Sequence, residues 1–150
     1  MEGMFRFREA LRAKALALAK AAAEALPGTV FLVGSFARGD FSEDSDVDLL
    51  VVAEFSEPPH RRLLDVDVPP GVEVIALTPR EAFRAVERCY PVAEDVALGV
   101  VLKDELGIAQ RLVEFARRCR SPEGAEASQS GPPSPQDAGG PGLEAGRAAT

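Results

Sequence analysis

The chain has 150 residues, the length of one ordinary domain, and a formal net charge of −7. Residues 1–120 carry 16 lysines and arginines against 20 aspartates and glutamates. This acidic balance argues against an extended nucleic-acid surface, because such surfaces neutralise phosphates with basic side chains. Charged residues also interrupt every long apolar run, which argues against a membrane span or a secretion signal, so we expect a cytoplasmic protein.

Cysteine and histidine are too few for a zinc site. The chain has Cys89, Cys119 and one histidine, His60, with no paired-cysteine motif. We expect both cysteines to be reduced thiols in helical segments rather than a disulfide.

The first half of the chain predicts a helix followed by two strands. Residues 4–26 are rich in alanine, with apolar residues near helical spacing, and Pro27-Gly28 ends the helix. The run TVFLV, residues 29–33, predicts a strand buried on both faces. A helical turn is expected from about residue 36, then a polar turn, and DVDLLVVA, residues 46–53, predicts the second strand.

The second half predicts one more central strand, an edge strand and four helical segments. A short helix is expected at residues 61–66 and a strand at 72–77. Thr78, Pro79 and Glu81 form a helix start, with threonine as N-cap and a glutamate three residues later. The remaining expectations are a helix to about residue 89, a helical segment from 91, an edge strand at 100–102, and a final helix at 106–120.

Three expectations about the fold and the domains follow. Residues 1–120 should form one α/β (α+β) domain, a small mixed β-sheet with flanking helices. The first two strands should be antiparallel, because the link between them is too short for a parallel crossover. Residues 121–150 are rich in Gly, Pro, Ser and Ala, so we expect a disordered tail.

Asp46 and Asp48 are the first candidates for chemistry. Residues two apart on a strand face the same side, about 6–7 Å apart. Two carboxylates at that separation can converge on metal ions, since like charges held together need cations to offset their repulsion. The alternative is a polar strand entrance whose acids face water, and an isolated D-x-D does not exclude it.

Gly34 and Ser35 follow the first strand directly. A glycine there lets the chain turn tightly and lets backbone N–H groups approach a ligand. If a helical turn begins at this point, its free N–H groups can bind an anion. The alternative is a routine turn.

The combination of these motifs is more specific than either alone. The stretch from Gly34 to Leu49 follows the pattern G-S-x-A-R-G-x5-S-D-x-D-L. This pattern resembles the signature of the minimal nucleotidyltransferases of the DNA polymerase β-like superfamily, and the broader similarity covers about residues 10–115. The resemblance implies the polymerase β-like nucleotidyltransferase fold.

The resemblance also implies roles for particular residues. Gly34 and Ser35 would hold the β- and γ-phosphates of a nucleoside triphosphate. Asp46 and Asp48 would bind two Mg²⁺ ions, and a third carboxylate on a neighbouring strand would complete the metal site. Glu73 is the best candidate for that carboxylate, although the family more often has aspartate there.

Three further acidic or basic positions stay open. Asp65 and Asp67 are lesser candidates for the third carboxylate. Arg38 either binds phosphate or fixes its loop through Asp40 or Glu43.

The function implied is transfer of a nucleoside monophosphate, AMP from ATP in the first instance, to a hydroxyl acceptor. Proteins of this kind often act as antitoxins on a separate HEPN-domain protein, which would be the partner here. The alternative is a module of the same fold with weak catalysis that binds a nucleotide or a partner. An unrelated acidic domain with a chance motif is the third interpretation.

Overall fold

A computed structural model of the chain describes residues 2–120. The predicted tail, 121–150, and with it the proposed domain boundary, lies outside the described residues.

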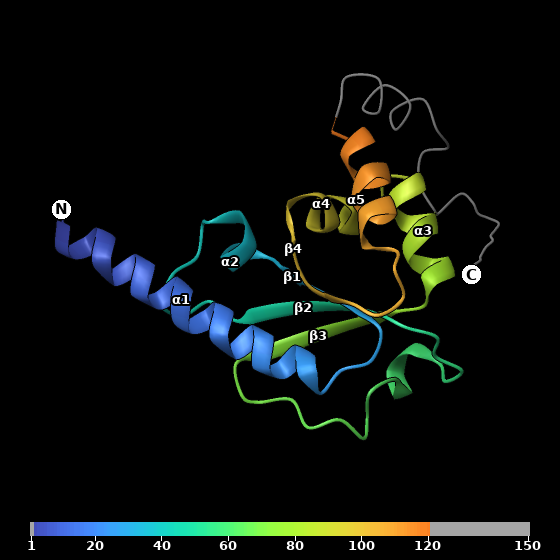
Figure 1. The fold of residues 1–150 in the computed structure, drawn as a ribbon, viewed down its shortest axis with the longest axis horizontal. Helices are drawn as coiled ribbons and strands as arrows, with labels where there is room; N and C mark the ends of the chain where they lie inside the picture. The colour runs from blue at the N-terminus through green and yellow to red at the C-terminus, as the bar shows by residue number, and fades with distance from the viewer. Residues whose placement is uncertain (1, 121–150) are drawn as a thin grey trace.

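A four-stranded mixed sheet forms the centre of the molecule (Figure 1). Its strands are β1 (Thr29–Val33), β2 (Val47–Val52), β3 (Val72–Leu77) and β4 (Val100–Asp104), in the order β3-β2-β1-β4. β1 is antiparallel to both β2 and β4, whereas β2 and β3 are parallel. The predicted mixed sheet, the antiparallel first pair and the edge strand are therefore confirmed.

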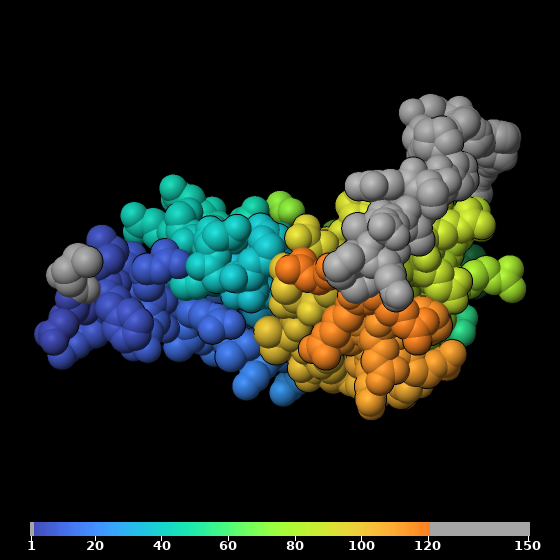
Figure 2. Space-filling model, turned by 90° about the horizontal axis from the view of Figure 1, so that it is seen from above, coloured from blue at the N-terminus to red at the C-terminus, as the bar shows by residue number. Residues whose placement is uncertain are grey.

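Helices cover both faces of the sheet (Figure 1). One face packs against α1 (Glu2–Glu24). The opposite face packs against α3 (Pro79–Glu87), α4 (Pro91–Leu98) and α5 (Ala109–Arg118). The first half of α1 extends beyond the sheet, at the end of the molecule away from α3–α5 (Figure 2).

The alternation of side chains along β1 explains why this strand is buried throughout. Val30 and Leu32 lie in the cluster beneath α1, whereas Phe31 and Val33 lie in the cluster beneath the other helices. Successive residues of a strand point to opposite faces, so a strand between two helical layers needs an unbroken apolar run. Thr29–Val33 meets that requirement, as predicted.

The helix predicted at residues 61–66 is wrong. Only Pro59–Arg61 forms a single 3₁₀ turn. Leu63 then adopts a φ of 65°, in the left-handed region, which a right-handed helix cannot contain.

The final helix begins later than predicted, at Ala109. Gly107 has a φ of 70° and turns the chain, and the Asp104 carboxylate accepts hydrogen bonds from the backbone N–H groups of Ile108 (3.0 Å) and Ala109 (3.3 Å). The carboxylate thus satisfies donors at the helix start, where the helix itself supplies no acceptor.

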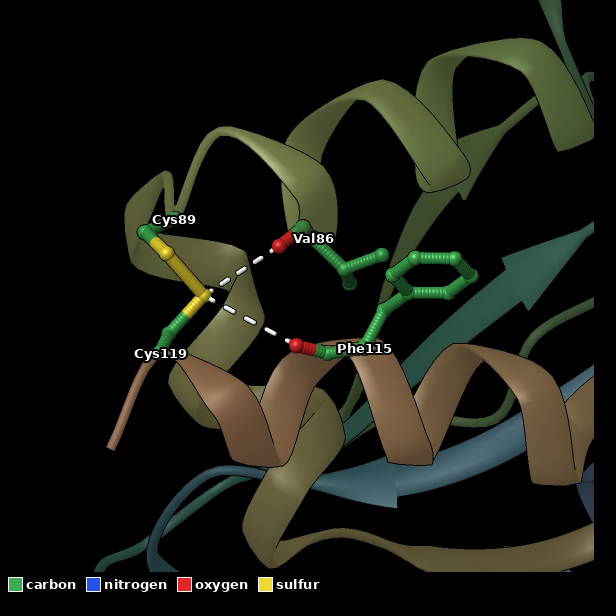
Figure 3. The surroundings of a disulfide bond; sticks show 4 residues. All are labelled: Val86, Cys89, Phe115 and Cys119. Carbon is green, nitrogen blue, oxygen red and sulfur yellow. Dashed lines mark hydrogen bonds between the residues drawn. A yellow bond between two sulfur atoms is a disulfide. The ribbon is translucent and has the colours of Figure 1, made fainter. Parts of the chain in front are cut away.

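The prediction of reduced thiols is also wrong, because Cys89 and Cys119 form a disulfide (Figure 3). α3 and α5 lie side by side, and their C-terminal ends bring the two Cα atoms to 5.5 Å, a separation that suits the bond. Cys119 Sγ also lies 3.2 Å from the carbonyl oxygen of Val86. This is a packing contact, since a disulfide sulfur carries no proton to donate.

Within residues 2–120, no helix is both long enough and apolar enough to cross a membrane.

Candidate active site

Strand register brings three predicted site positions to one edge of the sheet. Val33, the last residue of β1, lies opposite Asp48 on β2. Asp48 in turn lies opposite Glu73 on β3. Gly34 follows Val33 directly, so the turn after β1 and the two acids of β2 and β3 share the same end of adjacent strands.

Both the backbone conformation and the lack of room for a side chain require glycine at position 34. Its φ is 76° with a ψ of −156°, a combination that other residues rarely adopt. A Cβ atom added here would also collide with the carboxylate of Asp48. The glycine therefore lets the backbone lie directly against the acid that the sequence pattern singles out.

Ser35 opens a single helical turn, α2 (Ser35–Arg38). Phe36 anchors this turn: it is buried and stacks on Phe41 with ring centroids 4.7 Å apart. The N–H groups at the start of any helical turn lack partners within it. The anchored turn therefore fixes Ser35 directly after Gly34, whose backbone lies against the carboxylate of Asp48.

The acids at this edge of the sheet influence one another's pKa values. Burial raises the pKa of Asp48, and the charges of Asp46 and Asp95 raise it further, while Arg38 opposes the shift. A hydrogen bond with Asp46 is the main cause that raises the pKa of Glu73, followed by the charges of Asp46 and Asp48. The three predicted carboxylates therefore lie within interaction range of one another.

Asp95 is a member of this group that sequence reasoning missed. It lies on α4, is half-buried, and its pKa is raised by burial, with Arg38 lowering it. Its proximity to Asp48 depends on α4 packing across the end of β1, where Gly99 approaches the carbonyl of Leu32. No local pattern around Asp95 signals that long-range contact.

Arg38 adopts one of its two expected roles. Its Nε lies 3.3 Å from Asp40 Oδ2, so it pairs within its own loop. Both groups are exposed, and pairs of this kind are weak. The guanidinium also acts on Asp48 and Asp95, so a phosphate contact stays a prediction.

The lesser candidates, Asp65 and Asp67, are exposed on the loop that precedes β3. Neither contributes to the pKa shifts of Asp48 or Glu73. The register of β2 and β3 therefore favours Glu73 over both as the third carboxylate.

The donor set suits a hard divalent cation such as Mg²⁺. Asp46, Asp48 and Glu73 present only carboxylate oxygens, which Mg²⁺ prefers. Besides burial for Asp48 and the hydrogen bond with Asp46 for Glu73, charge repulsion contributes to their raised pKa values, and a cation between the acids would relieve it. As the side chains stand, however, no three acidic, histidine or cysteine groups among residues 2–120 already converge as metal ligands. The acids are near one another without being pre-formed into a closed site.

Comparison with known proteins gives a family match. A family model described as "Nucleotidyltransferase domain" matches residues 16–113, which include all these site positions. A solved structure described as "Crystal structure of the toxin-antitoxin with AMP-PNP" is similar over 79% of this chain and 93% of that chain, with 17% identity and a TM-score of 0.45. That likeness is too distant to carry an inference about function. No curated protein matched the chain.

Proposed function

The chain belongs to the nucleotidyltransferase domain family, and on that premise we propose that it moves AMP from ATP to a hydroxyl acceptor with the help of Mg²⁺. The family establishes the general activity, transfer of a nucleotidyl group. The nucleotide, the metal and the acceptor are the proposal.

One observation carries it: Asp48 lies between the Gly34 turn on one side and Glu73 on the other. Nucleotidyl transfer needs a cradle for the outgoing phosphates beside carboxylates that attract cations. Sheet register brings the proposed cradle and the proposed carboxylates together from three segments of the chain, which supports the proposal.

Each of these residues has a task in the reaction. Gly34 and Ser35 would hold the β- and γ-phosphates, which leave as pyrophosphate when the acceptor oxygen attacks the α-phosphorus. Asp46, Asp48 and Glu73 would hold two Mg²⁺ ions, which stabilise charge on the attacking and leaving oxygens. We propose that Glu73 would also receive the acceptor's proton.

For the acceptor, we propose a hydroxyl on a separate HEPN-domain protein, with this chain as the antitoxin. The support is the G-S-x-A-R-G-x5-S-D-x-D-L pattern between Gly34 and Leu49 and its resemblance to the minimal nucleotidyltransferases. Incubating the two proteins with α-labelled ATP and Mg²⁺ tests it. Label on the HEPN protein supports the assignment, and label found only on other acceptors contradicts it.

The site itself is tested by nucleotide binding. Calorimetry with ATP should show binding that requires Mg²⁺ and is lost when Asp46→Asn and Asp48→Asn are combined. Asp65→Asn with Asp67→Asn is the matched control, since it removes the same charge from exposed positions nearby. Equal binding by both double variants would contradict the assignment of the site.

The alternative is a module of the same fold that binds a nucleotide or partner and turns over slowly. It is favoured by the absence, among the described residues, of three converged ligands, and by the longer Glu73 where the family more often has aspartate. Glu73→Asp distinguishes the two. An enzyme limited only by the length of Glu73 should gain transfer activity, whereas a binding module should remain as slow as the wild type.

A further inference from the structure

Two arginines and a tyrosine form a second polar cluster, where α3 ends and α4 begins. Arg84 and Arg88 are four residues apart, so they lie on the same side of α3 about 6 Å apart along its axis. The guanidinium groups of Arg88 and Arg84 both act on the phenol of Tyr90 and lower its pKa. All three side chains are exposed, with Tyr90 at 40%. The donors are therefore accessible to a ligand.

The backbone that carries this cluster is held from both sides. Cys89, between Arg88 and Tyr90, turns the chain with a φ of 56° and is bonded to Cys119 on α5 (Figure 3). The Tyr90 N–H donates to the Ala85 carbonyl at 2.9 Å, which ties the turn back to α3. The fixed turn lowers the backbone entropy lost on binding, although the two arginine side chains still lose rotamer freedom.

The charge of the cluster is not balanced by acids. Within residues 2–120, neither Arg84 nor Arg88 forms an ion pair with a carboxylate. The acid one turn into α4, Glu94, is already paired with Arg120 at 3.3 Å. Two positive charges thus lie beside a hydroxyl without a negative partner, on a chain that is acidic as a whole.

We propose that Arg84, Arg88 and Tyr90 form a binding site for a phosphate group, distinct from the acidic edge of the sheet. A phosphate dianion matches the two guanidinium charges, and its oxygens can accept from both forks and from the phenol hydroxyl. A carboxylate has fewer oxygens and half that charge. The phosphate can come from a small phosphorylated molecule or from a nucleic-acid end.

The site does not depend on nucleotidyl transfer, but α4 links it to the proposed active site. Tyr90 precedes Asp95 by five residues, about 7.5 Å along the axis of α4, and Asp95 acts on Asp48.

The sequence provides a built-in probe, because Tyr90 is its only tyrosine and tryptophan is absent. The pKa of Tyr90 is lowered, chiefly by the hydrogen bond from Arg88 and also by that from Arg84. A bound phosphate would offset those charges and raise the pKa again. The phenolate absorbance and the tyrosine fluorescence of the native protein can both follow this change.

The experiment is a titration with inorganic phosphate in chelator, so that no divalent cation occupies the acidic edge, at constant ionic strength set with chloride. We expect saturable binding, accompanied by a rise in the pKa of Tyr90. Arg84→Gln with Arg88→Gln should weaken phosphate binding by about tenfold or more, as expected for lost hydrogen bonds to a charged group. Tyr90→Phe keeps the ring and should weaken binding less, as measured by calorimetry.

Arg6→Gln with Arg12→Gln is the matched control, since both arginines are exposed on α1 and the change of charge is the same. This control should bind phosphate as the wild type does. No response of wild-type Tyr90 to phosphate, or equal weakening in the control, overturns the proposal. A second arm with a 5′-phosphorylated single-stranded RNA separates the sources: tighter binding than inorganic phosphate identifies a nucleic-acid end, and equal or weaker binding identifies a small molecule.

Discussion

At the residue scale, Gly34 offers a test in which backbone strain and site geometry can be separated. Gly34→Ala forces a Cβ into the Asp48 carboxylate and also strains the backbone, at a φ of 76°. We expect a loss of stability of about 1–3 kcal/mol and a loss of most nucleotidyl transfer. Chemical denaturation and a transfer assay measure the two effects.

Gly39 supplies the control for that substitution. It has a φ of 98°, but an added Cβ would meet no neighbour within 4 Å. Gly39→Ala should therefore cost stability through backbone strain alone and retain transfer activity. If both alanine variants lost activity equally, the close approach of Gly34 to Asp48 would have no special role.

Asp48 should show opposite effects on stability and activity. Burial and neighbouring acids raise its pKa, so its charge is unfavourable in the folded protein. Asp48→Asn should therefore increase the free energy of unfolding, measured at neutral pH without divalent cations. The same change should reduce transfer by more than about 100-fold. Loss of an outer-shell partner of a metal costs up to about that much, and loss of a direct ligand should cost more. A variant that is destabilised yet active would refute the electrostatic account.

At the scale of elements, the start of α3 predicts how stability depends on pH. Glu81 completes the capping box with Thr78 and pairs with Arg62, whose side chain is only 6% exposed. The hydrogen bond from Arg62 is the first cause that lowers the pKa of Glu81 below 4.5, its ordinary value. A lowered acid pKa gives stability that is fully present above pH 4.5 and is lost as the pH falls through the folded pKa.

Glu81→Gln should keep a cap at this position but leave Arg62 without its carboxylate. We expect a loss of about 1–2 kcal/mol at neutral pH, less than for a fully buried pair because the Glu81 side chain is 41% exposed. Denaturation at several pH values should also show a smaller decline below pH 4.5 than in wild type. Glu43→Gln, at an exposed turn position, should follow the wild-type curve.

The disulfide links two elements, and its removal has a predictable cost. Cys89 and Cys119 are 30 residues apart, and a loop of that length corresponds to about 3–4 kcal/mol in the chain-entropy treatment. Reduction of the wild type, or Cys119→Ser, should lower the free energy of unfolding by up to that amount. Unchanged stability on reduction, with two thiols titrating before reductant is added, would show that the bond does not form in solution. Two free thiols before reduction would agree with the expected cytoplasmic location, because disulfides are rare in reducing compartments.

At the scale of the whole molecule, the sequence predicts the fold best where a local pattern determines the structure. The run Thr29–Val33 and the capping residues of α3 have short-range causes, and both appear as predicted. The juxtaposition of Asp48 with Glu73 depends instead on how β3 aligns with β2 after a loop of irregular structure. Sequence alone could make Glu73 a candidate but could not place it.

Two features that sequence reasoning missed depend on packing between distant elements. Asp95 approaches Asp48 only because α4 crosses the end of β1. The two cysteines meet only because α3 and α5 are neighbours. Neither contact has a spacing in the sequence that could reveal it.

The most direct test of the central claim compares two positions of the label in ATP. With Mg²⁺ and an acceptor, label at the α-phosphate should move to the acceptor, label at the γ-phosphate should leave as pyrophosphate, and Asp46→Asn with Asp48→Asn should abolish both. Transfer of γ-label to the acceptor, or full α-label transfer by the double variant, would contradict nucleotidyl transfer at this site.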